Sequence, residues 1–370
     1  MQEFNKTVVI LHPSYWEQAM GGAEIQIKYL VSFFKKKDLN VHYIFEDKDK
    51  PYTNELNINL HPLKRIKIPK TIGNRWFLYR NTILKLLHTI EPNVIYTRFY
   101  SSWTGMASNY SVKNKIPHLW AIASNNDLVK KTKFNFLLKP FDFFEYLIII
   151  NAFKHTKNII VQNNEQKLLL KKNFGIDGLL LRQAVPKPKN EKINKEYNKL
   201  NIVWIANLKK IKRPEYFIQI ADEYSDNPNF KFIMIGRQNE NYKKLIEESN
   251  LNNSNFQFRG EVSNSEVNEI LLESHILINT SEYEGFSNVF LQAWSRKNIV
   301  FSMNSNPDEI LTKENIGCLI PTIEEIKNKL NYFWQNREEL EGMSERAYKY
   351  VAANHNLDYN LHKIAELMKI

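Results

Sequence analysis

A polar turn at residues 280–287 contains two carboxylates and a glycine, and it leads from an apolar run into an apolar, helix-like segment. Glu284 stands just before this segment, and Gln292 follows eight positions later, about two helical turns on. Both side chains can therefore lie on one side of the helix. A carboxylate or an amide there can hydrogen-bond paired hydroxyl groups, such as those of a sugar. The alternative is a helix start that is only capped, by Ser281 or Glu284.

A second candidate is a cluster of cations after the apolar run 201–206, made of Lys209, Lys210, Lys212 and Arg213. Pro214 follows and suits the first turn of a helix. Lysines near a helix N-terminus are unfavourable beside the positive end of the helix dipole unless an anion lies between them. The cluster therefore indicates a phosphate site, with a solvated basic loop as an equally weighted alternative.

A third candidate is the pair Gly21-Gly22, which stands at the start of a predicted helix. Glycines let the backbone approach a ligand closely, and a helix N-terminus favours an anion such as a diphosphate or a carboxylate. The alternative is a loop that needs a positive φ angle. By itself the pair is a weak indication.

The elements that must position these residues are short apolar runs alternating with helix-like segments. The first series of runs lies at 7–13, 40–45, 93–99, 117–124, 158–163 and 179–185, and the second at 201–206, 230–235, 256–259, 275–279 and 298–303. The runs are rich in β-branched residues and do not strictly alternate with polar ones. This is typical of parallel strands buried on both faces by helices.

A segment of linker composition, rich in Pro and Lys at 184–190 and polar at 190–199, separates the two series. We therefore predict an N-terminal domain at 1–190, a C-terminal domain at 191–345 and terminal helices at 346–370 that pack back toward the N-terminal domain. Open parallel sheets bind ligands at the carboxyl ends of their strands. Two such edges facing each other would hold one substrate on each side of a cleft.

Composition narrows the class of protein. Apolar residues make up 43% of the 370-residue chain and charged residues 25%, which is typical of packed domains rather than of disordered chains. The net charge of +11 attracts anions, although a lysine-rich composition without a functional meaning explains it equally well. Cys318 is the only cysteine, which excludes an intrachain disulfide and a cysteine-based metal site. The nine histidines are scattered, and we expect no metal site.

Location and large partners are predicted from the same patterns. No apolar run approaches the ~20 residues that cross a bilayer, and residues 1–6 hold no apolar signal region, so we expect a cytoplasmic protein. Lysines alternate with aromatic residues over 129–144. This pattern suits an anionic membrane surface, or equally an amphipathic helix packed on its own domain. No nucleic-acid-binding motif stands in the sequence, and we expect no nucleic-acid partner.

Together these stretches resemble glycosyltransferase family 4, among the group 1 glycosyltransferases. The resemblance covers nearly the whole chain and is most specific across 201–311. It implies the GT-B fold, an α/β architecture with two Rossmann-like parallel-sheet domains facing a cleft.

The stretch 284–289 is similar to the start of the family's E-x7-E signature. The first glutamate falls on Glu284, which the resemblance implies to be catalytic and to contact the donor sugar. The second falls on Gln292, where glutamine replaces glutamate. The other residues implied to bind the donor along this stretch are Gly285, Phe286, Ser287 and Asn288.

The family's Arg/Lys pair for the donor diphosphate falls on Asn207 and Lys212. Lys212 matches and is implied to be catalytic, whereas Asn207 replaces the arginine. Further implied donor contacts are the N-terminal glycine loop, the glycine after the second strand of the nucleotide domain, and the stretch that lines the nucleobase. These contacts fall on Gly21, Gly22, Gly236, Arg237 and Arg259.

The acceptor side of the resemblance rests on fewer residues. Many members carry a histidine after the strand that here ends near 120–124, and no histidine stands there. Ser124 and Asp127 occupy that region, and we expect Ser124 to contact the acceptor and Asp127 to take part in catalysis. Arg98, at the end of the run 93–99, is expected to hold an acidic acceptor group or a phosphate.

The resemblance implies a retaining glycosyltransferase of the hexosyl type that needs no cofactor or metal and uses a UDP- or GDP-sugar. Lys212 and the helix start near Gly22 would stabilise the leaving diphosphate. The acceptor would be a saccharide or a lipid-linked compound in the synthesis of cell-surface polysaccharide or glycolipid, with the protein peripheral on the inner face of the cytoplasmic membrane. Two alternatives stay open: a nucleotide-sugar epimerase or phosphorylase of the same fold, and a non-catalytic nucleotide-sugar-binding protein.

Overall fold

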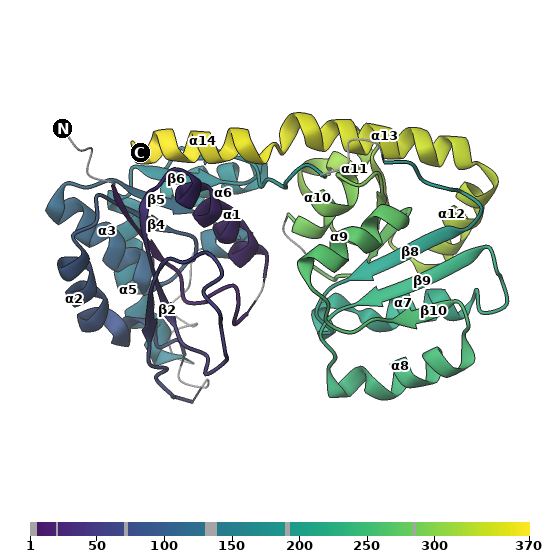
Figure 1. The fold of residues 1–370 in the computed structure, drawn as a ribbon, viewed down its shortest axis with the longest axis horizontal. Coiled ribbons are helices and arrows are strands. Elements are labelled where there is room, and N and C mark those ends of the chain that lie inside the picture. Colours follow the sequence, from purple (N-terminus) through teal and green to yellow (C-terminus); the bar gives the residue numbers. More distant parts are fainter. Residues whose placement is uncertain (1–5, 20, 70–72, 130–138, 189–192, 284–285) are drawn as a thin grey trace. The chain divides into compact units, whose positions relative to one another are not determined.

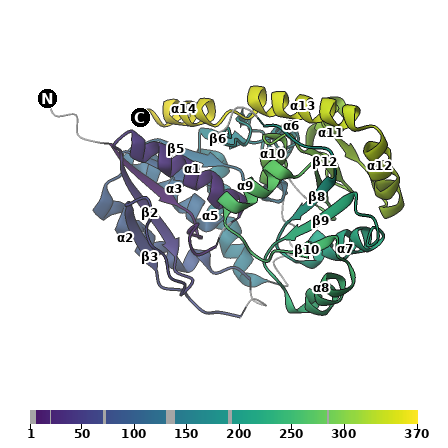
Figure 2. The ribbon, with the colours of Figure 1, turned by 45° about the vertical axis from the view of Figure 1, so that its right-hand side comes forward.

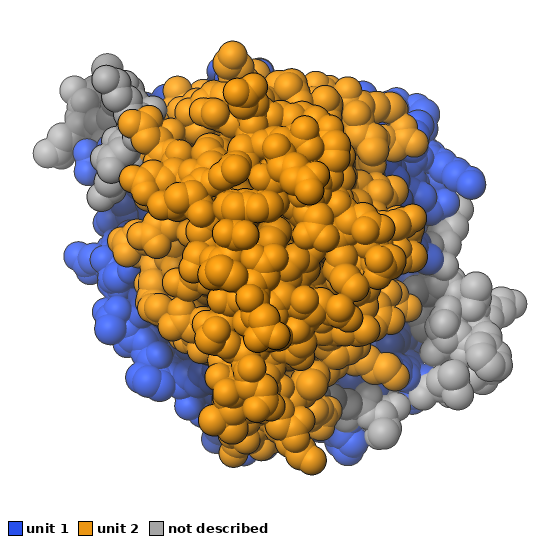
Figure 3. Space-filling model, turned by 90° about the vertical axis from the view of Figure 1, so that its right-hand side faces the viewer, with its two compact units in different colours: residues 1–182, 358–370 blue, residues 183–357 orange. Residues whose placement is uncertain are grey.

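The computed structural model describes residues 6–19, 21–69, 73–129, 139–188, 193–283 and 286–370. The chain divides into two compact units, which Figure 3 colours separately. Unit 1 comprises residues 1–182 and 358–370, and unit 2 comprises residues 183–357.

Unit 1 contains a parallel sheet of seven strands within the described residues, in the order β3-β2-β1-β4-β5-β6-β7. Figure 1 labels β2, β4, β5 and β6 of this sheet. Its strands are β1 (Thr7–Leu11), β2 (Asn40–Glu46), β3 (Asn59–Leu63), β4 (Val94–Thr97), β5 (His118–Ala121), β6 (Asn158–Val161) and β7 (Leu179–Leu180). Its helices are α1 (Gly22–Lys36), η2 (Trp76–Tyr79), α2 (Arg80–Ile90), α3 (Ser102–Asn114), η3 (Asn125–Leu128), α5 (Pro140–His155), α6 (Asn164–Phe174) and α14 (Leu357–Met368).

Unit 2 repeats this plan with a parallel sheet of six strands within its described residues, in the order β10-β9-β8-β11-β12-β13. Its strands are β8 (Leu200–Ile205), β9 (Phe230–Ile235), β10 (Phe256–Phe258), β11 (Ile276–Asn279), β12 (Ile299–Ser302) and β13 (Gly317–Leu319). Its helices are η4 (Lys210–Lys212), α7 (Pro214–Asp222), α8 (Glu240–Asn252), α9 (Asn264–Glu273), α10 (Asn288–Trp294), η5 (Pro307–Glu309), α11 (Ile310–Lys313), α12 (Ile323–Gln335) and α13 (Arg337–Asn354).

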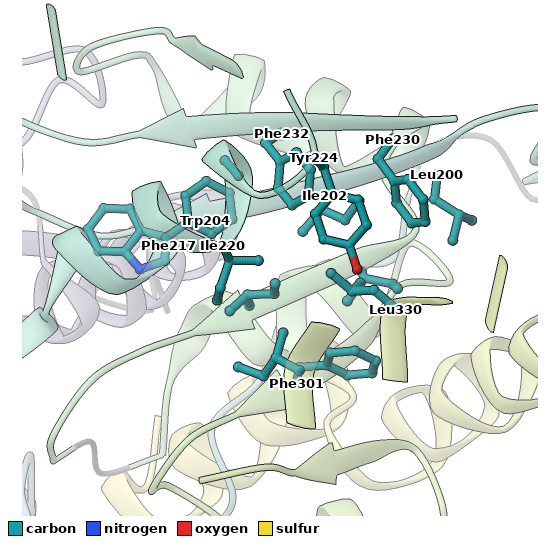
Figure 4. Packing of buried hydrophobic residues seen from close by; sticks show 14 of the residues in the cluster. Leu200, Ile202, Trp204, Phe217, Ile220, Tyr224, Phe230, Phe232, Phe301 and Leu330 are labelled. Atoms are coloured by element: carbon teal, nitrogen blue, oxygen red, sulfur yellow. The ribbon is translucent and has the colours of Figure 1, made fainter. Parts of the chain in front are cut away.

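Alternate residues of each central strand pack against helices on opposite faces of the sheet. In β8, Ile202 and Trp204 join the cluster formed with α7 and α12, which Figure 4 shows around Phe217 and Leu330. Val203 belongs to the opposite cluster, with residues of α9, α10 and α11. Burial on both faces explains why these strands are continuous apolar runs.

The last helix, α14, packs on unit 1. Asn360 Nδ2 donates to the carbonyl oxygen of Arg182, and the ring of His362 lies edge-on to Phe33 of α1 at 5.0 Å. Figures 1 and 2 both show α14 beside α1. Its apolar side is buried through Leu361, Ile364 and Met368 among others.

The chain passes between the units at 182/183 and at 357/358. The segment that follows the first crossing is tied to the end of α13, since Val185 N donates to the carbonyl oxygen of His355 at 3.3 Å and Val185 pairs with Asn356. The sequence places the divisions at 190/191 and 345/346, so these hydrogen bonds assign residues 183–188 and the end of α13 to unit 2.

Two strands were missing from the sequence prediction, β3 and β13, and both lie at a sheet edge. Pro62 stands inside β3, and a proline in an apolar run argues against a central strand because it cannot donate a ladder hydrogen bond. Strand β13 has only three residues and begins with Gly317. Both sequences therefore lack the signal of a buried strand.

Candidate active site

Unit 2 carries its polar loops at the carboxyl ends of its strands, and the strand order reverses between β8 and β11. In an open parallel sheet the loops on either side of such a reversal leave toward opposite faces, and ligands bind where they part. Asn207 and Lys212 follow β8, and Ser287 and Gln292 follow β11. The sequence-predicted donor residues of this unit thus share one edge of its sheet.

A buried threonine ties the loop after β8 to the loop after β11. Thr280 Oγ1 donates to the carbonyl oxygen of Lys212 at 2.6 Å and accepts from Trp204 Nε1 at 2.9 Å. Thr280 is 0% exposed and Trp204 is 2% exposed. The bond to Trp204 is therefore shielded from water, and the bond to the half-buried Lys212 fixes the backbone of that residue.

The backbones of the same two loops also touch. Glu282 N donates to the carbonyl oxygen of Ile211 at 2.8 Å. The catalytic Glu284 of the sequence prediction and the adjacent Gly285 lie outside the described residues. The structure thus joins the stretch just before Glu284 to the stretch just before Lys212.

Arg213 holds this junction from the other end of the cationic loop. Its Nε donates to the carbonyl oxygen of Thr280 at 2.6 Å and its Nη2 to that of Ser281 at 3.2 Å. Its guanidinium also lies 5.0 Å from the centre of the Tyr216 ring. The backbone of Arg213 has a φ of 46°, a left-handed conformation that these contacts support. Arg213 therefore stabilises the two loops through these contacts.

The remaining cations of this loop are more open. Lys209 and Lys210 are exposed, as is Asn207, whereas Lys212 is half-buried. Lys209 and Lys210 can therefore supply the charge that Asn207, in place of an arginine, lacks.

The loops after β8 and β9 meet at Gly236. Its amide donates to the carbonyl oxygen of Gly260 at 2.9 Å, and a Cβ placed on it would lie 1.7 Å from the carbonyl oxygen of Ala206. Only glycine fits there without moving the backbone. Gly236 therefore sets the spacing of the loops that follow three neighbouring strands, β8, β9 and β10.

The two arginines expected at this edge are paired with glutamates. Arg237 makes two hydrogen bonds to the carboxylate of Glu261, at 2.7 and 2.8 Å, and Arg259 makes one to Glu266 at 3.0 Å. These side chains are 39–53% exposed, so each pair contributes little to stability. Either arginine would have to leave its partner to bind a phosphate.

The remaining residues of this unit that the sequence predicts to bind the donor lie at the start of α10. Ser287 is the N-cap and Asn288 the first residue of α10. Ser281 Oγ instead donates to Asn279 Oδ1 at 2.7 Å, so the alternative of Ser281 as the cap is wrong. Phe286 is buried, with its ring 5.1 Å from that of His355, which leaves only its backbone for a ligand.

Gln292 lies on the face of α10 that packs on α9. It is 4% exposed, and its Nε2 donates to Asn264 Oδ1 at 2.8 Å and to Asn268 Oδ1 at 3.2 Å. The three amides form a polar cluster between two helices. Whether Gln292 and Glu284 lie on one side of α10 stays a prediction, because Glu284 lies outside the described residues.

In unit 1 the strand order reverses between β1 and β4, and the expected residues follow these strands and β5. Gly21 is the N-cap of α1 with a φ of −146°, so the alternative of a loop with positive φ is wrong. His12 Nε2 lies 3.2 Å from Glu24 Oε1 in the first turn of α1. Burial alone would raise the pKa of Glu24, but the hydrogen bond and charge of His12 hold it below its usual value.

Ser124 and Asp127 form the capping box of η3. Ser124 Oγ accepts from Asn126 N at 3.2 Å, and Asp127 Oδ2 accepts from Ala123 N at 3.0 Å and from Ser124 N at 3.1 Å. Burial raises the pKa of Asp127 to about 6, although these N–H groups and the charge of Arg98 oppose the shift. Both side chains thus shape the turn after β5.

Arg98 follows β4 and is 6% exposed. Its Nη1 donates to Tyr96 Oη at 3.4 Å. The structure therefore places the three residues expected on the acceptor side, Arg98, Ser124 and Asp127, after the adjacent strands β4 and β5.

The described residues contain neither a metal-binding cluster nor a membrane-spanning helix. No group of three or more His, Cys, Asp or Glu side chains in this part of the chain is arranged to hold a metal ion. No helix there is both long enough and apolar enough to span a bilayer.

Comparison with known proteins identifies the domain that carries the unit 2 loops. Residues 186–350 match the family model described as "Glycosyl transferases group 1". Unit 2 carries a group 1 glycosyltransferase domain. The matched stretch includes Asn207, Lys212, Gly236 and Gln292, and it covers all the described residues of this unit that the sequence predicts to bind the donor. A sequence search of curated proteins gives no match.

Solved structures extend the likeness to the whole chain. The structure is similar to the sucrose-phosphate synthase from Thermosynechococcus elongatus, with a TM-score of 0.77 and 12% identity over 99% of this chain and 98% of that one. It is also similar to HepE from Anabaena in complex with UDP and glucose, with a TM-score of 0.71 and 11% identity over 98% and 99%. For WaaG, a glycosyltransferase involved in lipopolysaccharide biosynthesis, the values are 0.72 and 14% over 98% and 99%. The chain has the GT-B fold, as the sequence predicted.

Sequence reasoning missed the residues that hold the glycosyltransferase loops together. Thr280 and Trp204 are separated by 76 positions, and their hydrogen bond depends on β8 and β11 being neighbours. Glu261 and Glu266, which pair with Arg237 and Arg259, also carry no motif. The strand order would have been needed to find them.

Proposed function

We propose that this protein is a retaining glycosyltransferase that moves a hexosyl group from a UDP- or GDP-sugar to a hydroxyl acceptor. The observation that carries the proposal is the junction of the loops after β8 and β11. There Thr280 bonds the backbone of Lys212, and Glu282 bonds that of Ile211, within the matched stretch. This junction supports a cation and a carboxylate working on the same donor.

In the proposed reaction, the bond between the sugar and the diphosphate breaks as the acceptor hydroxyl attacks from the face on which the diphosphate leaves. Lys212 stabilises the negative charge that develops on the leaving group. Glu284 orients the sugar, and the departing phosphate oxygen takes the proton of the hydroxyl. No group other than the substrates enters this balance.

The choice of donor is guided by a structural neighbour. HepE was solved in complexes with UDP, with UDP and glucose, and with UDP-glucose. UDP-sugars are therefore the first donors to test, and GDP-sugars the second.

The test of this function is incubation of the full-length protein with UDP- and GDP-hexoses and a panel of saccharide acceptors. Release of the nucleoside diphosphate together with a new glycoside of unchanged anomeric configuration is expected. A donor that is only isomerised would indicate an epimerase. Tight donor binding without turnover by any acceptor would indicate a non-catalytic binder, and either result would overturn the proposal.

We also propose that the protein works at the inner face of the cytoplasmic membrane, on a lipid-linked acceptor for cell-surface polysaccharide or glycolipid. The support is a group of exposed apolar side chains on α5 and the neighbouring η2, which we call the α5 apolar face. It is made of Leu78, Phe143, Phe144 and Leu147, each 42–48% exposed. Phe144 lies 5.3 Å from Phe77, the neighbour of Leu78, so the two elements are in contact. Exposed apolar side chains gathered in this way mark interaction sites.

Cations flank the α5 apolar face. Lys139 and Arg80 are exposed at the starts of α5 and α2. The sequence adds Lys130, Lys131 and Lys133 just before, in the segment 130–138 that lies outside the described residues. Exposed apolar side chains together with nearby lysines and arginines suit the anionic surface of a membrane.

A further inference from the structure

Arg98 of unit 1 is a buried cation without a carboxylate in direct contact among the described residues. It is 6% exposed, and no carboxylate of the described residues lies within 4.0 Å of its guanidinium. Its Nε is buried and has no hydrogen-bond partner among those residues, and its bond to Tyr96 Oη is long at 3.4 Å. Arginine stays charged in proteins. A buried charge that is not paired is costly, which indicates that something is missing from its surroundings.

Asp127 is the carboxylate whose charge interacts with Arg98, but it does not serve as a direct partner. Its Oδ2 is engaged by Ala123 N and Ser124 N. It therefore moderates the positive charge near Arg98 without occupying the guanidinium. Arg98 Nε thus stays available to a ligand.

Further buried polar atoms lack hydrogen-bond partners in the described part of the same sheet edge, and two of them lie after the strands next to Arg98. They are His12 Nδ1, after β1, and Asn125 Oδ1, after β5. Strands β1, β4 and β5 are adjacent, and the His12 ring lies 5.8 Å from that of Phe99, the neighbour of Arg98. Buried polar atoms are nearly always hydrogen-bonded, so the unpartnered atoms of Arg98, His12 and Asn125 could be satisfied together by one ligand at this edge.

The edge is also the one at which such a fold binds ligands. The strand order of unit 1 reverses between β1 and β4, the strands that precede His12 and Arg98. The fork of a guanidinium matches the paired oxygens of a carboxylate or a phosphate. His12 and Asn125 can hydrogen-bond neighbouring hydroxyl groups.

We propose that the carboxyl edge of unit 1 binds an oxyanion, a carboxylate or a phosphate ester, through Arg98, and that the acceptor is therefore an acidic saccharide. That the bound oxyanion belongs to an acceptor rests on the transferase activity proposed above. The oxyanion site itself does not. Arg98 binds and orients the acceptor, and no bond is made or broken at it.

The test measures oxyanion binding to the full-length protein by calorimetry and by the shift in Tm, with inorganic phosphate and glucuronate as separate probes. A Lys212→Ala background removes binding of phosphate at the donor loop of unit 2. Arg98→Met should abolish the response to at least one probe, and Arg98→Lys should weaken it about tenfold because the fork is lost. Arg65→Met, at a 44% exposed arginine of the same unit, is the matched control and should respond as the background does. The probe that binds tells a phosphate from a carboxylate.

A second readout separates binding from a structural role. Removing an orphan charge should leave the Tm of the ligand-free protein unchanged or higher. An Arg98→Met variant with an undiminished response to both probes, or with a Tm several degrees lower in the absence of ligand, would overturn the proposal. So would loss of UDP binding in Arg98→Met, measured with Lys212 intact, because the oxyanion would then belong to the donor. Oxyanion binding at Arg98 without any nucleotide-sugar binding would refute the transferase activity alone.

Discussion

At the scale of single residues, the site depends on side chains that fix backbone rather than touch a substrate. The buried Thr280 accepts from Trp204 Nε1 and donates to the carbonyl oxygen of the half-buried Lys212. Arg213 binds the carbonyl oxygens of Thr280 and Ser281. The Lys212 ammonium is therefore placed by residues that carry no motif of their own.

Thr280→Val should weaken donor binding and lower stability, whereas Thr280→Ser should preserve both. Valine keeps the shape but leaves the Trp204 N–H and the Lys212 carbonyl buried without partners, which costs about 1–3 kcal/mol. Urea unfolding and calorimetry with UDP and GDP measure the two effects. A valine variant that binds nucleotide as tightly as the serine variant would show that the hydroxyl does not position Lys212.

Asp127→Asn should change how stability depends on pH. The pKa of Asp127 in the folded protein is about 6, above its ordinary value of 3.8. The folded state therefore holds the proton more tightly than the unfolded state, and the free energy of unfolding falls as pH rises through this window. The asparagine variant lacks this fall. Relative to the original protein it should gain about 2–3 kcal/mol between pH 4 and pH 7. Urea unfolding at several pH values measures the difference, and a flat difference would contradict the shift.

At the scale of elements, the central strands could be predicted because burial on both faces leaves a continuous apolar run. Strand β8, with Ile202, Val203 and Trp204 packed on both faces, is the clearest case. The edge strands β3 and β13 could not, since an edge tolerates Pro62 and a three-residue strand. Loop contacts such as that of Arg237 with Glu261 depend on which strands are neighbours in the sheet. The alternation of strands and helices along the chain does not reveal the order of the strands in the sheet.

Gly236→Ala tests the close approach of the loops after β8 and β9. The added Cβ would lie 1.7 Å from the carbonyl oxygen of Ala206, so the backbone must move. We expect a loss of at least about 3 kcal/mol in the stability of unit 2, together with weaker nucleotide binding. Gly260→Ala is the control, because a Cβ there meets nothing within 4 Å and only the φ of 71° opposes it, at about 1 kcal/mol. Equal losses in both variants by urea unfolding would contradict the steric account.

The α5 apolar face makes a separate prediction about membranes. Phe144→Asp with Leu147→Asp should reduce flotation with vesicles of phosphatidylglycerol and phosphatidylcholine, because apolar side chains are replaced by charges of the same sign as the lipid. The control is Leu168→Asp on α6, where the leucine is 71% exposed but lies outside this face. The control should float like the unchanged protein. Equal flotation of all three proteins would exclude this face as the contact.

At the scale of the whole molecule, the chain is two similar α/β units, and each carries its candidate residues where its strand order reverses. The sequence predicted this plan and the GT-B fold from alternation and motif. It could not place the crossings at 182/183 and 357/358, since the bonds between Val185 and the end of α13 join residues 170 positions apart. Only unit 2 matches the family model, so the account of the donor is tied to this unit.

The most direct measurement of that account is calorimetric titration of the full-length protein with UDP and GDP, which need no acceptor. At least one nucleotide should bind to the original protein and to Lys244→Ala, a control on α8 of the same unit whose lysine is 90% exposed. Lys212→Ala should bind it at least tenfold more weakly, a loss of about 1.4 kcal/mol, because the cation beside the diphosphate is gone. Binding of neither nucleotide, or equal binding by the two lysine variants, would contradict a donor held by Lys212.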